Sequence, residues 1–494
     1  MSLIDVNKLS FGYDGSYDMV FEDVSFQIDT NWKLGFIGRN GRGKTTFLNL
    51  LLGKYEYKGK IHSSVNFEYF PYHVDDKSRE TLEILREICP EVMEWEISCE
   101  LAQLDVEDEV LYRPFETLSN GEQTKVLLAA LFLASNAFLL IDEPTNHLDY
   151  VARDSVKKYL KRKKGFILVS HDRVLLDECI DHVLSINKTN IEIQKGNFSS
   201  WFQNKEQQDN FELAQNEKLN KDIKRLSEAS KQNGEWSGRV EKSKKGTTNS
   251  GSKIDRGYVG HKAAKMMKRS KSLESRQQMA IREKSKLLKD IEVCSDLELR
   301  PIHHHSSRLL ELSNIAISYD DKEVCKDVNF AVMQNERIAL TGKNGCGKSS
   351  VLKLICGENI KYTGEIFHAG GLIISVVPQS TEGLAGTLHE YARESMVDET
   401  LFMTILRKLD FPRDQFDKRI ENYSEGQKKK VLLAASLGKQ AHIYIWDEPL
   451  NYIDVLSKIQ IERLIMEYEP TLIFVEHDST FVKNIATRVI EIGS

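Results

Sequence analysis

The chain opens with an alternation of apolar and polar residues over positions 3–10, and this period of two predicts a β-strand. Further strands are predicted at 24–28 and 32–37. Two uninterrupted apolar runs, at 138–141 and 166–169, predict strands that are buried on both faces. Such runs are typical of a parallel sheet covered by helices, so we expect an α/β fold.

The predicted strand at 32–37 leads directly into Gly38-Arg39-Asn40-Gly41-Arg42-Gly43-Lys44-Thr45, and a helix is predicted to follow over 45–52. A glycine, four free positions and Gly-Lys-Ser/Thr form a phosphate-binding loop. Its glycines let backbone N–H groups cradle phosphate oxygens, the lysine adds a positive charge, and the hydroxyl can ligate Mg²⁺. The same pattern returns at 342–349. The expected phosphate-binding residues are Gly38, Asn40, Gly41, Gly43, Lys44, Thr45 and Thr46, and Gly342, Asn344, Gly345, Gly347, Lys348, Ser349 and Ser350.

Other features repeat at nearly constant distance. A Ser-x-Gly element opens a predicted helix, an Asp-Glu pair ends the buried strand at 138–141, and a histidine follows the buried strand at 166–169. Such strand ends are where α/β proteins place ligands. The pairs are separated by 305 or 306 positions and the two phosphate loops by 304, which indicates a tandem duplication. They are Ser119 and Ser424, Gly121 and Gly426, Asp142 and Asp447, Glu143 and Glu448, and His171 and His477.

A different segment lies between the two copies. Apolar residues stand at helical spacing at Leu219, Ile223 and Leu226, and a second set occupies 273–291. This spacing predicts two long amphipathic helices packed antiparallel, and about 33 residues each would make them about 50 Å long. The expected domains are therefore a first α/β domain at 1–198, a helical hairpin linker at 199–305 and a second α/β domain at 306–494.

The linker is basic. Positions 239–276 hold twelve Lys or Arg against three acidic residues, a net charge of +9, whereas the whole chain has a net charge of −6. A basic rod beside acidic domains indicates a nucleic-acid partner. The alternative is that these lysines only solvate an exposed helix. Candidate contact residues are Lys253, Ile254, Arg256, Lys262, Lys265, Lys268 and Arg269.

Composition changes this interpretation little. The 494 residues hold 40% hydrophobic and 29% charged residues, enough for several cores, and no apolar run is long enough to span a bilayer. The N-terminus carries no secretory signal, so we expect a cytoplasmic protein. Seven scattered cysteines suit a reducing compartment. Cys346 could be oxidation-sensitive, but a packing role is favoured, and the run His303-His304-His305 is interpreted as a solvated connector rather than a metal site.

The order of these motifs resembles that of ATP-binding cassettes, and two fused cassettes with a basic hairpin and no membrane domain resemble the ABC-F proteins. The resemblance implies ATP and Mg²⁺ as cofactors and two ATP sites in one monomer. Mg²⁺ would be held by Thr45 and Asp142, and by Ser349, Gln379 and Asp447. Glu143 and Glu448 would activate water, while His171 and His477 would contact the γ-phosphate.

The resemblance also implies that each Ser-x-Gly signature serves the opposite cassette. Ser119 and Gly121 would complete the site of Lys348, and Ser424 and Gly426 that of Lys44. Tyr13 and Tyr319 match the adenine-stacking aromatic of the family, although packing is the ordinary role of a lone tyrosine.

Two departures from the family pattern predict unequal sites. Tyr72 stands where the first cassette should present the glutamine that Gln379 supplies in the second. The second cassette also reads Glu448-Pro449-Leu450-Asn451-Tyr452, without the Thr and His that follow Pro144 in the first. Both sites keep lysine, aspartate, glutamate and histidine, so we expect both to hydrolyse ATP.

Several stretches, among them Gly196-Asn197-Phe198-Ser199 and Met267-Lys268-Arg269-Ser270-Lys271, look closest to the Lsa-type antibiotic-resistance proteins. That resemblance implies protection of the ribosome, with large-subunit rRNA and P-site tRNA as partners and no stable membrane subunit. Lincosamides, pleuromutilins and streptogramin A would be displaced. A housekeeping translation factor and the ATPase subunit of a drug exporter remain as alternatives.

Overall fold

The computed structural model describes residues 2–13, 19–134, 136–146, 148, 150–187, 190–242, 297–319, 322–343 and 345–493, together with single positions at 268, 272, 275, 276 and 279. The chain forms two compact units. One combines Met1–Trp201 with Cys294–Ser494 and contains both predicted α/β domains, and the other is Phe202–Val293.

The main sheet of the first cassette has six strands in the order β5-β6-β7-β3-β8-β9. All neighbouring pairs are parallel except β8 and β9, an antiparallel pair that the hydrophobic pattern did not predict. The buried runs are strands as predicted, and Asp142 and Val169 are register partners at the carboxyl ends of β6 and β7. The strands are β3 (Lys33–Ile37), β5 (Asn66–Phe70), β6 (Ala137–Asp142), β7 (Phe166–Val169), β8 (His182–Asn187) and β9 (Asn190–Lys195).

A second, antiparallel sheet covers the phosphate-loop helix of this cassette. Its order is β2-β1-β4, and the predicted alternation at the N-terminus forms β1, with Ile4, Val6 and Leu9 fully buried. These side chains share a core cluster with Phe36 and Phe47. The strands are β1 (Leu3–Phe11), β2 (Phe21–Asp29) and β4 (Lys58–His62).

The helices of the first cassette fall between these strands, and several of them are short. They are α1 (Lys44–Leu51), α2 (Thr81–Ile88), α3 (Glu94–Gln103), α4 (Asn120–Leu133), α5 (Tyr150–Arg162) and α6 (Arg173–Cys179), with 3₁₀ turns η1 (Asp108–Tyr112) and η2 (Phe115–Thr117).

The second cassette repeats this plan with a parallel five-stranded sheet, β14-β15-β16-β12-β17, and an antiparallel sheet, β11-β10-β13. Its strands are β10 (Arg308–Tyr319), β11 (Lys322–Met333), β12 (Arg337–Thr341), β13 (Tyr362–His368), β14 (Ile374–Val377), β15 (Ile443–Asp447), β16 (Leu472–Val475) and β17 (Arg488–Glu491). Its helices are α9 (Lys348–Ile355), α10 (Leu388–Glu394), α11 (Glu399–Lys408), α12 (Glu425–Gly438), α13 (Val455–Tyr468) and α14 (Ser479–Ile485), with η4 (Arg413–Gln415) and η5 (Ile420–Asn422).

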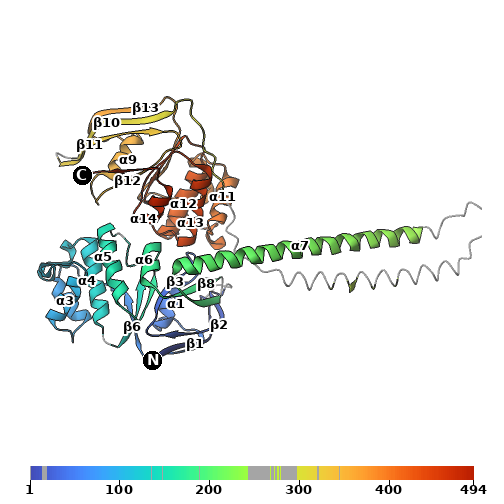
Figure 1. Cartoon of the computed structure of the whole chain (residues 1–494), viewed down its shortest axis with the longest axis horizontal. Coiled ribbons are helices and arrows are strands. Elements are labelled where there is room, and N and C mark those ends of the chain that lie inside the picture. The colour runs from blue at the N-terminus through green and yellow to red at the C-terminus, as the bar shows by residue number, and fades with distance from the viewer. Residues whose placement is uncertain are drawn as a thin grey trace, which may run out of the picture. The chain divides into compact units, whose positions relative to one another are not determined.

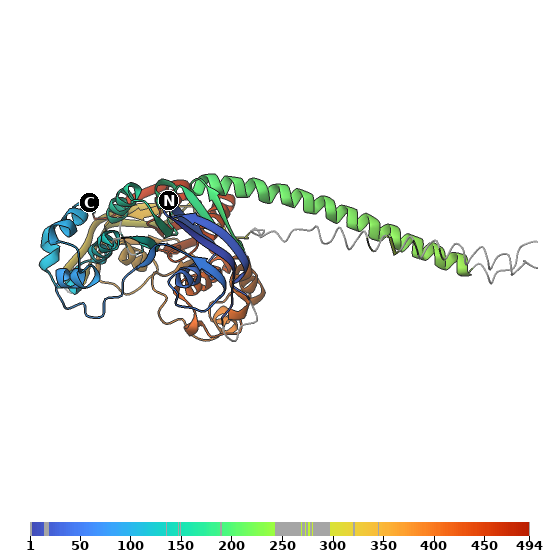
Figure 2. The ribbon, with the colours of Figure 1, turned by 90° about the horizontal axis from the view of Figure 1, so that it is seen from below.

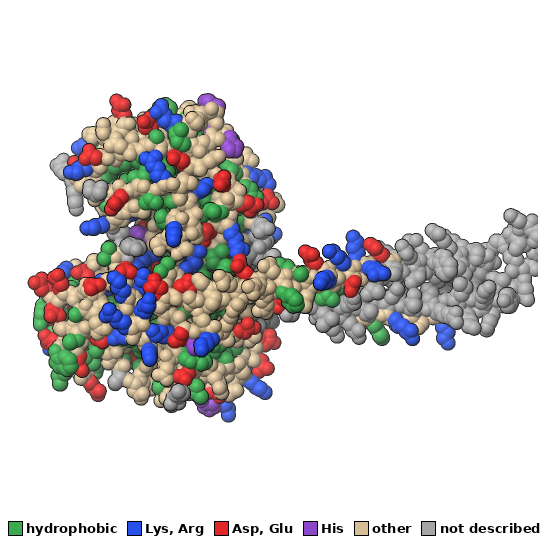
Figure 3. Space-filling model, in the orientation of Figure 1, with side chains coloured by type: hydrophobic (Ala, Val, Ile, Leu, Met, Phe, Trp, Pro, Cys, Tyr) green, Lys and Arg blue, Asp and Glu red, His purple; other side chains and the backbone are tan. Residues whose placement is uncertain are grey.

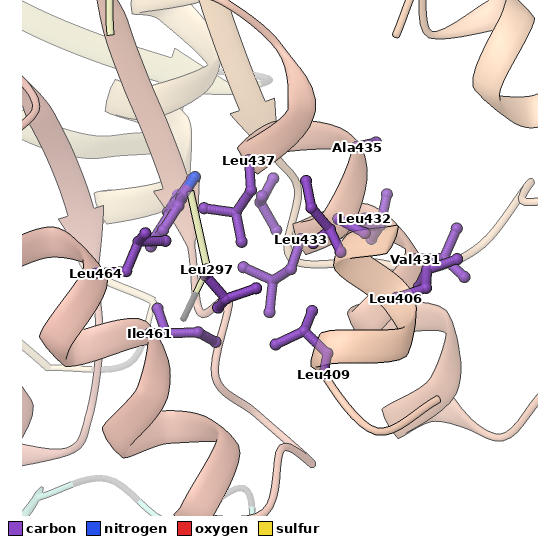
Figure 4. Packing of buried hydrophobic residues seen from close by; sticks show 14 of the residues in the cluster. Leu297, Leu406, Leu409, Val431, Leu432, Leu433, Ala435, Leu437, Ile461 and Leu464 are labelled. Atoms are coloured by element: carbon purple, nitrogen blue, oxygen red, sulfur yellow. The ribbon is translucent and has the colours of Figure 1, made fainter. Parts of the chain in front are cut away.

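The core of the second cassette is built around α12, which follows the signature loop. Figure 4 shows Leu433 and Leu437 of α12 facing Leu297, which comes from the segment just before the cassette, and Ile461 and Leu464 of α13 nearby. Leu297 is only 3% exposed. The segment after the linker therefore contributes to the core that supports the signature helix.

One helix carries the first arm of the predicted hairpin. Figures 1 and 2 show α7 (Phe198–Lys242), in green, as an uninterrupted helix of 45 residues, about 68 Å long. The prediction of about 33 residues was too short, because the helix continues past Gln232 through a stretch rich in glycine and serine. The second arm of the predicted hairpin lies almost wholly outside the described residues.

The described part of α7 is not basic. Its side chains that the structure describes include six acidic and five basic residues, and Figure 3 shows both kinds interspersed along it. Of the candidate contact residues, Lys268 is exposed, whereas Lys253, Ile254, Arg256, Lys262, Lys265 and Arg269 lie outside the described residues. Among the described residues, none of the helices has the length and apolar character needed to cross a membrane.

His304 uses both ring nitrogens on backbone groups, donating from Nε2 to the Gly370 carbonyl oxygen at 3.0 Å and accepting at Nδ1 from the Ser306 N–H at 3.0 Å, as suits a connector. The six cysteines that the structure describes are free thiols.

Candidate nucleotide sites

Each phosphate loop turns into its helix through a glycine with left-handed backbone geometry. Gly43 precedes α1 with φ of 92°, and Gly347 precedes α9 with φ of 95°. A Cβ atom on Gly43 would lie 2.5 Å from Val20 Cγ1, so only glycine fits there. The lysine that starts each helix donates to its own loop, from Lys44 Nζ to Gly38 O at 2.7 Å and from Lys348 Nζ to Gly342 O at 2.9 Å.

The first loop borders a cavity of about 330 Å³ that unites most residues predicted for the first site. Its lining residues come from the segment after β1, the phosphate loop and α1, the end of β6 and the segment after β7. The tyrosine, the phosphate loop, the acidic pair and the histidine therefore surround one space. Its lining includes Tyr13, Asn40, Gly41, Gly43, Lys44, Thr45, Thr46, Asp142, Glu143 and His171.

The second loop borders a cavity of about 380 Å³, and this one is lined from both cassettes. From the second come Gly345, Gly347, Lys348, Ser349, Ser350, Gln379, Glu448 and His477. From the first come Asn120, which stands between Ser119 and Gly121, and Arg153 of α5. Ser119 itself caps α4, accepting from the Glu122 N–H at 3.2 Å. Asn344 lies outside the described residues. The motifs had not indicated Arg153, because it stands within a helix rather than at a motif position.

The signature of the second cassette also lies against the first phosphate loop. Asn40 Nδ2 donates to the Tyr452 carbonyl oxygen at 2.6 Å, and a Cβ atom on Gly426 would lie 2.7 Å from that same oxygen. Arg42 Nη2 reaches both carboxylate oxygens of Asp410 at 3.3 Å. These contacts bring Gly426 to the loop of Lys44, which is the exchange that the family resemblance implied.

The residues predicted to hold a metal supply hard oxygen atoms. Thr45 Oγ1 donates to Asp142 Oδ2 at 3.1 Å, and the Ser349 hydroxyl acts to lower the pKa of Asp447 in the second cassette. In the second cassette, Asp447 Oδ1 is buried and has no hydrogen-bond partner in the described part of the chain. A hydroxyl and a carboxylate fit Mg²⁺, which takes few protein ligands and keeps phosphate oxygens and waters. Among the described residues no group of three or more His, Cys, Asp or Glu side chains could hold a metal unaided.

A glutamate and a histidine meet in each site. The distance from His171 Nε2 to Glu143 Oε1 is 3.3 Å, and that from His477 Nε2 to Glu448 Oε1 is 3.2 Å. Both glutamates have left-handed backbones, with φ of 51° and 46°. Their N–H groups are held by Val169 O at 2.9 Å and by Val475 O at 3.0 Å. Such backbone strain is tolerated where the surroundings enforce it. In both sites it occurs at the glutamate whose carboxylate contacts the histidine.

The two glutamates nevertheless differ electrostatically. Burial, and then the neighbouring Asp142 carboxylate, raise the pKa of Glu143 to about 8. Burial acts upward on the pKa of Glu448 too, but hydrogen bonds from His477 and Gln379 outweigh it and hold that pKa below its usual value. The predicted inequality of the sites therefore has a physical counterpart in their charge environments.

Gln379 contacts the glutamate rather than the aspartate of its site, since its Nε2 donates to Glu448 Oε1 at 3.0 Å. Its counterpart in the first cassette is Tyr72, which turns away and donates from its hydroxyl to Glu68 Oε2 at 3.2 Å. The first site instead receives Tyr69, whose hydroxyl donates to Asp142 Oδ2 at 3.1 Å. We had not identified Tyr69 from the sequence, where it reads as one more aromatic in a strand.

The altered loop after Glu448 gains contacts of its own. The Leu450 N–H donates to Glu476 Oε1 at 2.7 Å, and Asn451 Nδ2 donates to Glu448 Oε2 at 2.6 Å. Glu476 is only 8% exposed and precedes His477, where the first cassette has Ser170 before its histidine. A buried carboxylate therefore anchors the loop that lacks the usual threonine.

Tyr13 and Tyr319 occupy matching places beside the phosphate-loop helices. Their hydroxyls bond to Thr46 Oγ1 at 2.7 Å and to Ser350 Oγ at 3.3 Å. Both side chains stay nearly half exposed, at 46% and 45%. Because the hydroxyl of each is held while much of the side chain is open, both tyrosines suit the stacking role better than a packing role.

Buried charges join the cassettes away from the loops. Arg173 Nη1 donates to Glu462 Oε2 at 2.7 Å, with both side chains at most 10% exposed. Lys458 Nζ donates to the His171 carbonyl oxygen at 3.2 Å. The histidine-bearing segment of the first cassette therefore contacts α13 of the second.

Comparison with known proteins identifies the two cassettes. The ABC transporter family matches residues 21–146 and again 325–451. The ribosome protection protein VmlR of Bacillus subtilis is 26% identical over 505 residues, covering 99% of this chain and 87% of that protein. The energy-dependent translational throttle protein EttA of Haemophilus influenzae is 23% identical, covering 96% and 89%.

Solved structures agree on the fold. The archaeal ribosome recycling factor aABCE1, determined in complex with a ribosomal stalk protein, superposes with a TM-score of 0.62 at 18% identity, covering 98% of this chain and 87% of that one. The two matched segments contain the phosphate loops and the Asp-Glu pairs described above. The chain belongs to the ATP-binding cassette family, in its ABC-F branch, and it binds and hydrolyses ATP.

Proposed function

We propose that this protein protects the ribosome from antibiotics. In this proposal the ATP-bound form, with both cassettes closed on two ATP molecules, binds the ribosomal exit site. The linker hairpin then reaches toward the peptidyl-transferase centre and displaces lincosamides, pleuromutilins and streptogramin A. Hydrolysis of ATP releases the protein. Large-subunit rRNA and P-site tRNA are the expected partners.

The observation that carries this proposal is the similarity to the ribosome protection protein VmlR over 99% of the chain. The match includes the linker as well as the cassettes. A linker helix of 45 residues and a net charge of +9 over 239–276 support a nucleic-acid partner. An exporter subunit would have no use for either feature.

We also propose that each site uses Mg²⁺. Thr45 and Asp142 would hold it in the first site, and Ser349 and Asp447 in the second, with Gln379 close by. Bound there, Mg²⁺ would neutralise phosphate charge. Lys44 and Lys348 would bind the phosphates, Glu143 and Glu448 would orient the attacking water, and His171 and His477 would contact the γ-phosphate.

Ribosome co-sedimentation tests the proposal. A Glu143→Gln, Glu448→Gln double variant keeps the ATP-binding residues while losing both carboxylates, so with ATP it should pellet with ribosomes in near-stoichiometric amount. With ADP it should stay in the supernatant. A Lys44→Ala, Lys348→Ala variant is the matched control and should not pellet with either nucleotide. Absence of the double variant from the ribosome pellet in ATP would overturn the proposal.

A housekeeping translation factor is the second candidate, favoured by the similarity to the translational throttle protein EttA over 96% of the chain. Drug susceptibility separates the two functions. Expression in a susceptible bacterium should raise the inhibitory concentration of lincosamides, and expression of the Lys44→Ala, Lys348→Ala control should not. Ribosome binding without any change in susceptibility would favour the housekeeping function.

A further inference from the structure

The strand beside the Asp-Glu pair carries a tyrosine, Tyr69, in the first cassette and a valine at the equivalent position in the second. In the first cassette Phe70 is the register partner of Ile141, and in the second Val377 is the partner of Trp446. Ile141 and Trp446 each precede the metal-binding aspartate. Tyr69 therefore occupies the position that Val376 occupies in the second cassette.

This difference changes the surroundings of the aspartate. In the first cassette the Tyr69 hydroxyl donates to Asp142 Oδ2 at 3.1 Å, and Thr45 Oγ1 donates to the same oxygen at 3.1 Å. Val376 has no polar side-chain atom, and Asp447 Oδ1 remains buried without a partner among the described residues. A second hydrogen bond thus fixes the carboxylate of one cassette only.

The tyrosine ring is itself held in place. It packs on the core cluster of the first cassette, and Lys54 Nζ lies 5.4 Å from its centroid, within the range of a cation–π contact. The corresponding position after α9 is Glu358, which could not make this contact. A ring held on two sides presents its hydroxyl to Asp142 in one orientation.

We propose that Tyr69 is a positioning residue of the first ATP site, whose hydroxyl orients the Asp142 carboxylate for Mg²⁺. Both hydrogen bonds that Asp142 receives in the described part of the chain end on Oδ2, which leaves Oδ1 toward the metal. Partners that orient a metal ligand typically contribute about tenfold or more to metal affinity. The proposal concerns ATP binding alone and stands whether or not the protein acts on the ribosome.

The proposal also accounts for Tyr72. This residue replaces the glutamine of the second cassette, yet its hydroxyl is bonded to Glu68 Oε2 at 3.2 Å rather than to the site. In the second cassette the polar contact runs from Gln379 to Glu448, the glutamate of the site. In the first cassette it runs from Tyr69, three residues before Tyr72, to Asp142, the aspartate of the site.

Metal binding gives the test. Mn²⁺ replaces Mg²⁺ as a paramagnetic probe, and electron paramagnetic resonance counts bound Mn²⁺ in the presence of a non-hydrolysable ATP analogue. Tyr69→Phe removes one oxygen atom and keeps the ring. We expect one of two Mn²⁺ ions to bind about tenfold more weakly, while the other keeps its wild-type affinity. Tyr72→Phe is the matched control and should leave both affinities unchanged.

A kinetic measurement isolates the first site. In a Glu448→Gln background, Tyr69→Phe should raise the Mg²⁺ concentration for half-maximal ATP hydrolysis about tenfold, with turnover at saturating Mg²⁺ close to that of the background. In a Glu143→Gln background it should change nothing. The proposal is overturned if both Mn²⁺ affinities match wild type, if both fall together with the melting temperature, or if Tyr72→Phe has the same effect.

Discussion

Replacing Arg173 by methionine should weaken ATP-driven association of the two cassettes. Arg173 Nη1 lies 2.7 Å from Glu462 Oε2, and the two side chains are 10% and 9% exposed. The substitution keeps a long apolar stem but leaves the Glu462 carboxylate buried without its cation. Arg173 belongs to the first cassette and Glu462 to the second. The substitution should therefore destabilise the form in which the two cassettes are in contact.

The size of the effect follows from the remaining contacts. Removing one member of a buried ion pair costs about 3–5 kcal/mol. Glu462 Oε1 still accepts from Asn484 Nδ2 at 2.6 Å, which favours the lower end of that range. A loss of about 3 kcal/mol lowers the association constant about 100-fold. Because closure takes up two ATP molecules, the half-saturating ATP concentration should rise about tenfold.

Energy transfer between one fluorophore on each cassette measures this shift. The titration is done in the Glu143→Gln, Glu448→Gln background, so that bound ATP persists. Lys163→Met is the matched control, because Lys163 Nζ pairs with Glu100 Oε2 at 2.7 Å within the first cassette. The control should lose thermal stability and keep its ATP dependence. An unchanged half-saturating ATP concentration for Arg173→Met would refute the argument.

Three further predictions follow from the sites and the linker. Glu143→Gln and Glu448→Gln should each reduce steady-state release of radiolabelled phosphate from ATP, and full activity in either single variant would show that its site does not hydrolyse. Asp454→Asn should destabilise the protein by about 3 kcal/mol in urea denaturation, because Lys430 Nζ, 3.3 Å from Asp454 Oδ2, would lose its buried partner; unchanged stability would contradict this. Ile254→Ala should lower the protection of expressing cells against lincosamides, and unaltered protection would remove Ile254 from the proposed contact surface.

Much of the fold could be predicted because its signals are local and repeated. Apolar runs such as 138–141 became buried strands, and each phosphate loop lies between a strand and a helix as its motif requires. The antiparallel pair β8 and β9 was missed, since short strands at a sheet edge carry little periodicity. The length of α7 was underestimated because the glycine and serine residues after Gln232 lower helix propensity without ending the helix.

The site was predictable where a motif fixes both residue type and spacing. Lys44, Asp142, Glu143 and His171 line one cavity because the loop and two strand ends meet at the same edge of the sheet. Tyr69 could not be found this way, because its role depends on strand register and on a hydroxyl that reaches the neighbouring strand. Arg153 was missed for a related reason, since it serves the cavity of the opposite cassette.

Displacement of a bound drug tests the central claim most directly. Ribosomes carrying a radiolabelled lincosamide are mixed with the Glu143→Gln, Glu448→Gln double variant, and the drug retained by the ribosomes is measured with ATP and with ADP. The account predicts that retained drug falls in proportion to the bound protein with ATP and stays constant with ADP. Drug that remains fully bound while the protein occupies the ribosome would contradict it.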